Sequence, residues 1–120
     1  MAYSAPIAAA MSGVQYVLQA AATTGNGNVL AVPFAFKNHN FMITAAAGVS
    51  SGAVQVETSN DSADAGTWAP LTVSPTAVVA GTDILVAYAG ILNFVRARIS
   101  TTIAGGGSPS VTVTYVGARA

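Results

Sequence analysis

The chain has 120 residues, of which only eight are Asp, Glu, Lys or Arg, while 52% are hydrophobic and the formal net charge is zero. The four cations are too few and too scattered for a nucleic-acid surface, no apolar stretch is long and uninterrupted enough to span a membrane, and the absence of cysteine excludes disulfides. Because soluble domains usually devote about a quarter of their residues to charge, we expect other proteins to cover this surface.

The first segment of the chain, residues 1–13, is predicted to be an extended arm. Pro6 lacks a backbone donor, and Ser12-Gly13 is a turn signal. The segment is apolar, but no Lys or Arg precedes its apolar stretch, and Gln15 and Gln19 interrupt the pattern further along. A secretory signal is therefore not expected, and residues 14–120 are predicted to form one domain.

The first strands of that domain have distinct patterns. In residues 14–22, Tyr16, Leu18 and Ala20 alternate with Gln15 and Gln19, which predicts a strand with the glutamines on its polar face.

Two longer apolar runs follow, at residues 29–36 and 41–46, on either side of Lys37-Asn38-His39-Asn40. This arrangement predicts a hairpin with His39 at its tip. Both runs are apolar on both faces, so we expect a neighbouring subunit to cover one side of each.

Short strand patterns separated by turn signals continue to the C-terminus, and hardly any stretch favours a helix. The remaining strands are predicted at residues 53–58, 68–73, 76–80, 83–88, 93–100 and 111–116. The pattern predicts an all-β fold, namely a single-domain antiparallel β-sandwich or jelly-roll-like barrel of about eight strands.

The polar loop at residues 60–66 is the best candidate for a ligand site. Asp61 and Asp64, together with Asn60, could hold Ca²⁺ through oxygen ligands. The loop lacks the alternating acidic spacing and the late bidentate Glu of a dedicated calcium loop, and Asp and Asn are common turn residues. A turn is the favoured interpretation, and no cofactor is expected.

Arg96 and Arg98 share one face of the predicted strand 93–100 with Phe94. The two arginines could pair within the chain, with Glu57 or Asp83, or reach the carboxylate of a partner protein. Both interpretations remain open.

Neither Trp68 nor His39 points to catalysis. Trp68 is interpreted as a core or interface anchor, and a sugar-stacking platform is the alternative. Since His39 is the single histidine, one chain cannot assemble a Ser-His-Asp triad or a histidine metal cluster. An enzyme is not expected.

Residues 54–61, VQVETSND, followed by GTW at 66–68, resemble a run found in small all-β virion proteins of tailed bacteriophages. Residues 94–100, FVRARIS, a Gly-rich loop and SVTVTY at 110–115 resemble the C-terminal strand pair of the same proteins. The resemblance covers residues 54–116. Its motifs describe strands and turns and specify no chemistry.

The resemblance implies a non-enzymatic structural protein of the virion. Within that class we favour a capsid decoration (cement) protein, whose relatives often form trimers, bind the major capsid protein and add an N-terminal arm to a neighbour's sheet. Residues 1–13 would supply that arm. The residues expected to contact partners are Tyr3, Pro6 and Ile7 in the arm and Phe94, Arg96, Arg98 and Trp68 in the domain.

Two alternatives remain. A tail, neck or head-fibre component is the nearest one. A carbohydrate-binding module using Trp68, Tyr88 and the Asp61/Asp64 loop is the alternative from another class. In the favoured interpretation the partners are the major capsid protein, other virion proteins and further copies of the chain. Nucleic acid and membrane are not expected partners.

Overall fold

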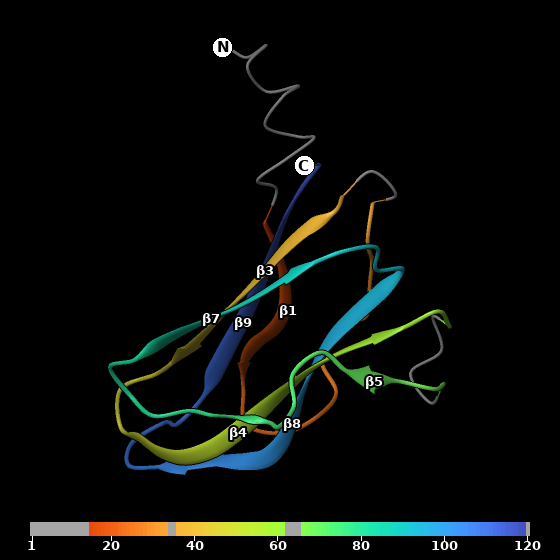
Figure 1. The fold of residues 1–120 in the computed structure, drawn as a ribbon. Coiled ribbons are helices and arrows are strands. Elements are labelled where there is room, and N and C mark those ends of the chain that lie inside the picture. Colours follow the sequence, from red (N-terminus) through yellow and green to blue (C-terminus); the bar gives the residue numbers. More distant parts are fainter. Residues whose placement is uncertain (1–14, 34–35, 62–65, 120) are drawn as a thin grey trace, which may run out of the picture.

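The computed structural model describes residues 15–33, 36–61 and 66–119. Within these ranges every regular element is a strand, and the strands form two antiparallel sheets that pack around one apolar core (Figure 1). The predicted all-β sandwich is thereby confirmed. The predicted arm, with Tyr3, Pro6 and Ile7, lies outside the described residues, as does Asp64.

Each sheet is built from strands far apart in the sequence. Sheet I contains, in spatial order, β1 (Gln15–Ala22), β9 (Val111–Ala118), β3 (Asn38–Ala45) and β7 (Asp83–Ala89). Sheet II contains, in spatial order, β2 (Leu30–Ala31), β8 (Phe94–Gly105), β4 (Val49–Ser59) and β5 (Ala69–Pro70), and β6 (Thr76–Ala77) also pairs with β4.

The core forms because several strands alternate between buried and exposed side chains, as the two-residue period of a strand requires. In β3 and β9 every second residue is buried. The core positions with less than 2% exposure include Leu18, Phe41, Ile43, Val54, Val56, Val95, Val111, Val113 and Tyr115. Complete burial of one such aliphatic side chain stabilises the fold by about 1.5–3 kcal/mol.

β1 departs from the predicted alternation after Val17. Its pairing with β9 shifts register between Val17 and Gln19, and both Leu18 and Gln19 are buried. A bulge of this kind redirects the side chains that follow it. Gln19 Nε2 donates hydrogen bonds to the carbonyl oxygens of Ala97 (2.7 Å) and Gly25 (3.1 Å), which compensate for burying its amide. The prediction that Gln19 lies on the polar face was wrong.

The predicted hairpin around His39 is not formed. β2 pairs with β8 in sheet II, whereas β3 lies in sheet I, so the chain crosses between the sheets. Pro33, which cannot donate to a sheet ladder, lies in the crossing segment. His39 is consequently a buried residue of β3 with 1% exposure, and not a hairpin tip.

Candidate functional site

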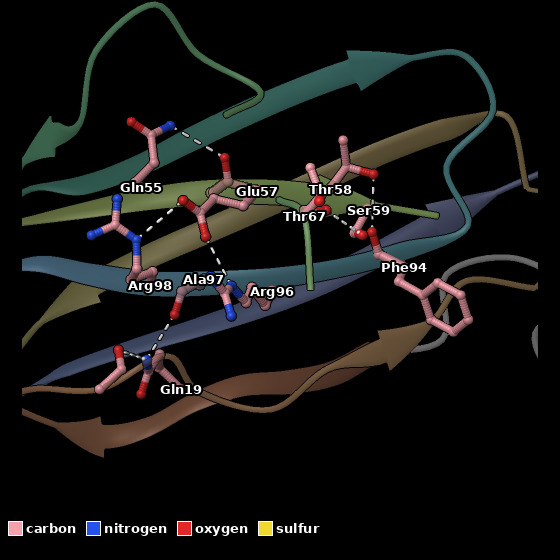
Figure 2. A network of polar contacts seen from close by, with 12 residues as sticks. Gln19, Gln55, Glu57, Thr58, Ser59, Thr67, Phe94, Arg96, Ala97 and Arg98 are labelled. Atoms are coloured by element: carbon pink, nitrogen blue, oxygen red, sulfur yellow. Dashed lines mark hydrogen bonds and ion pairs between the residues drawn. The ribbon is translucent and has the colours of Figure 1, made fainter. Parts of the chain in front are cut away.

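Glu57 of β4 lies between two arginines of β8 on the outward-facing side of sheet II (Figure 2). Arg96 Nε donates to Glu57 Oε1 at 2.8 Å, and Arg98 Nε donates to Glu57 Oε2 at 3.1 Å. The contact within the chain, one of the two interpretations that the sequence left open, is therefore present with Glu57. Asp83, the other possible partner, belongs to the opposite sheet.

This ion-pair cluster is largely covered. The side chains of Glu57 and Arg96 are 7% and 8% exposed, whereas that of Arg98 is 38% exposed. Trp68, just before β5, covers Arg96, with the guanidinium carbon 4.3 Å from the ring centroid, a cation–π distance. Gln55 Nε2 donates to Thr72 Oγ1 at 2.9 Å, which holds the segment after β5 over the same face.

The ion-pair cluster removes charged side chains from the exposed surface of the molecule. Three of the eight charged residues of the chain are engaged in it, and two of them are buried. The exposed surface is therefore even poorer in charge than the composition indicates. Phe94, at the start of β8, is half-buried, and its ring points away from the cluster (Figure 2).

A pocket of about 450 Å³ lies where β4 ends and the β7–β8 connection passes. Asn60, Asp61, Tyr88 and Asn93 are among its lining residues, and Asn93 Nδ2 donates to Asn60 Oδ1 at 2.7 Å. The backbone N–H of Asp61 donates to Ser59 Oγ at 2.9 Å, a turn closed by a serine side chain. Across the described ranges, no group of three or more His, Cys, Asp or Glu side chains could hold a metal ion.

A second polar group, which the sequence did not predict, is buried inside the sandwich at His39. His39 Nε2 lies 2.8 Å from the carbonyl oxygen of Gly90, and Nδ1 lies 2.6 Å from the Tyr115 hydroxyl. Because a carbonyl can only accept, Nε2 donates to the carbonyl oxygen of Gly90, and the Tyr115 hydroxyl is the hydrogen-bond partner of Nδ1. Both ring nitrogens of His39 thus have a hydrogen-bond partner inside the sandwich.

Burial of the Tyr115 hydroxyl is the main cause that raises its pKa from 10.0 to about 12, and the nearby Tyr16 contributes to the same shift. The folded state then holds the phenolic proton more tightly than the unfolded state does. The free energy of unfolding should keep its full value below pH 10. It should then fall by about 3 kcal/mol in all as the pH rises from 10 through 12. Urea unfolding at pH 8 and pH 11, for the chain and for Tyr115→Phe, measures this fall. If both proteins lose the same free energy of unfolding between the two pH values, the prediction is wrong.

The outer face of sheet I carries three of the exposed large hydrophobic side chains of the described residues. Val17, Thr114, Met42 and Leu85 form one row across all four strands, since they are successive cross-strand partners. Val17 is 44% exposed, Met42 38% and Leu85 55%. The run at residues 41–46, predicted to be apolar on both faces, buries Phe41 and Ile43 in the core and exposes Met42 and Thr44 on the other face.

Charge is almost absent from this sheet. Its four strands contain a single Asp, Glu, Lys or Arg residue, Asp83, at the first position of β7. The rest of the outer face carries Thr, Asn, Gln, Ala and Val side chains. A partner that covers a face of this composition buries apolar side chains without burying a charge.

Comparison with known proteins gives one informative likeness. No family model matches the chain, and no curated protein matches it. Among solved structures, the crystal structure of SPBc2 prophage-derived protein YomS is similar, with a TM-score of 0.63 and 14% sequence identity over 87% of this chain and 90% of that chain. The sandwich is therefore a fold that also occurs in a protein of prophage origin. The described residues contain no helix long and apolar enough to cross a membrane.

Proposed function

We propose that the chain is a non-enzymatic structural protein of a bacteriophage particle and, within that class, a capsid decoration protein that binds the major capsid protein lattice. The observation that carries the proposal is the exposed, nearly uncharged outer face of sheet I, with Val17, Met42 and Leu85 in one row. Exposed apolar side chains gathered on a nearly uncharged face mark sites that another protein covers. The shared fold with a prophage-derived protein and the resemblance of residues 54–116 to virion proteins support the same class.

The size of this face is adequate for specific binding. Four strands about 4.8 Å apart and about eight residues long present roughly 500 Å². Covering this area would bury about 1,000 Å² in total over the two partners, the lower range for a specific interface. Many copies on a closed lattice add avidity, and the free energy of binding then stabilises the assembled shell.

The direct test adds the purified chain to particles of the encoding phage that were assembled without it. The proposal predicts saturable binding in a fixed ratio to the major capsid protein and a higher temperature of shell disruption. Binding only to tails or necks would make the chain another particle component, the nearest alternative. No binding to any part of the particle would contradict the proposal.

Carbohydrate binding is the second candidate, because the pocket gathers the side chains of Asn60, Asn93, Asp61 and Tyr88. Amides and carboxylates bond sugar hydroxyls, and a tyrosine ring packs on the apolar face of a sugar. Trp68, the stacking platform that this alternative would use, packs on Arg96.

If this candidate is right, glucose, galactose or N-acetylglucosamine at about 50 mM should shift the Asn60 and Asn93 side-chain amide signals in NMR spectra, with dissociation constants of about 1 mM. Asn93→Ala should weaken binding at least tenfold. Unshifted amide signals with all three sugars would exclude this candidate.

A further inference from the structure

β7 is an open sheet edge. It pairs with β3 on one side, and no strand in the described ranges pairs with its other side. Its seven residues, DILVAYA, contain no Lys, Arg, Pro or Gly. A strand of this length and composition presents an unpaired row of backbone N–H and C=O groups that can pair with another chain.

The other edges of the sandwich are protected. Along β1, Asn28 N donates to the carbonyl oxygen of Leu18 at 2.8 Å, and Asn28 Nδ2 donates to that of Val17 at 3.1 Å. In sheet II the outermost strands are β2, β5 and β6, each only two residues long. Bulges, short strands and covering loops are the usual protections of an edge, and β7 shows none of them within the described residues.

The ladder between β3 and β7 identifies the groups that face outward. Gly90 N donates to the carbonyl oxygen of Lys37, and hydrogen-bonded pairs alternate along an antiparallel ladder. Ile84, Val86 and Tyr88 therefore exchange hydrogen bonds with β3 through their pairing with Ile43, Phe41 and His39. The backbone groups of the alternate residues, Leu85, Ala87 and Ala89, are directed to the free edge.

We propose that β7 pairs antiparallel with β7 of a second copy of the chain across a twofold axis, which joins the two copies of sheet I into one continuous sheet. The strand is complementary to itself. Its one charged residue, Asp83, lies at one end, so antiparallel pairing places the two carboxylates at opposite ends. Leu85, Ala87 and Ala89 bring no charge and no large polar group into the contact.

Pairing of this kind deepens the proposed function and rests on it for its role in the particle. It doubles the outer face of sheet I from roughly 500 to roughly 1,000 Å² per assembly, so one dimer presents a standard-sized surface to the lattice. A trimer, which the sequence resemblance implies, requires a head-to-tail contact and cannot be closed by this twofold pairing.

The test replaces an outward-facing N–H without disturbing the ladder to β3. Ala87→Pro removes one free-edge donor, and proline is tolerated at such positions of edge strands. Ala87→Thr is the matched control, since it keeps the N–H and favours a strand. Light scattering of the full chain over a concentration series should give a dimer of about 24 kDa, twice the 11.9 kDa of one copy, for the parent and for Ala87→Thr.

Ala87→Pro should raise the dimer dissociation constant at least tenfold, with an unchanged urea midpoint at a concentration where both proteins are monomeric. If Ala87→Pro does not fold, Ala89→Pro at the strand end provides the same test. A monomeric parent at 1 mM, a trimer, or a proline variant that remains dimeric would overturn the proposal. A monomeric Ala87→Pro chain that still binds particles leaves the decoration function intact, so the two proposals fail separately.

Discussion

Replacing Met42 with lysine is expected to weaken the proposed binding of the chain to the phage particle about 100-fold while leaving the fold intact. Met42 lies at the centre of the outer face of sheet I, between Thr114 and Leu85, and any partner covering that face would bury the new charge without a counterion. A buried, unpaired charge costs several kcal/mol, and about 3 kcal/mol corresponds to about 100-fold in affinity.

The matched control for Met42→Lys is Val73→Lys. Val73 is fully exposed at 106% and lies in the segment that follows β5, away from sheet I. Both variants should retain the urea midpoint of the parent, because each adds a charge at an exposed site. Co-sedimentation with particles measures the affinity, and equal binding of the two variants would show that the outer face of sheet I is not the contact.

Replacing Glu57 with alanine is expected to destabilise the sandwich by about 3–5 kcal/mol, because it leaves the buried Arg96 guanidinium without its carboxylate. Arg98→Ala should cost at most about 1 kcal/mol, since that side chain is 38% exposed. Urea unfolding of the two variants measures the difference.

The ranking of these variants is the informative result. If Glu57→Ala and Arg98→Ala have the same free energy of unfolding, the buried contact of Glu57 with Arg96 does not stabilise the fold more than the exposed contact with Arg98. A destabilised Glu57→Ala chain that recovers in Glu57→Leu/Arg96→Met would show that the cost arises from burying the Arg96 charge without the Glu57 carboxylate and not from lost packing.

The strands of sheet II that carry the ion-pair cluster could be predicted well from the sequence. In β4, Val54 and Val56 alternate with Gln55 and Glu57, and the facing residues of β8 alternate in the same way. A register slip of one residue would move all these side chains to the opposite face of the sheet. The pattern therefore determines which residues face the core and which face outward. The contact of Glu57 with the two arginines could accordingly be anticipated as one of two alternatives.

The connections between strands could not be predicted in the same way. A turn signal shows where the chain reverses but not whether the next strand joins the same sheet, and this depends on packing between distant residues. His39 illustrates the limit, since its partner Tyr115 lies 76 residues further along the chain. The bulge that buries Gln19 also depends on β9, its distant partner strand.

The central claim is that the chain is a component of the phage particle. The most direct measurement is quantitative mass spectrometry of gradient-purified particles of a phage whose genome carries the coding sequence of the chain. A decoration protein should be present at a copy number in fixed ratio to the major capsid protein, and this number should persist through repeated purification. Absence of the chain from particles, with the chain present in the lysate, would contradict the account.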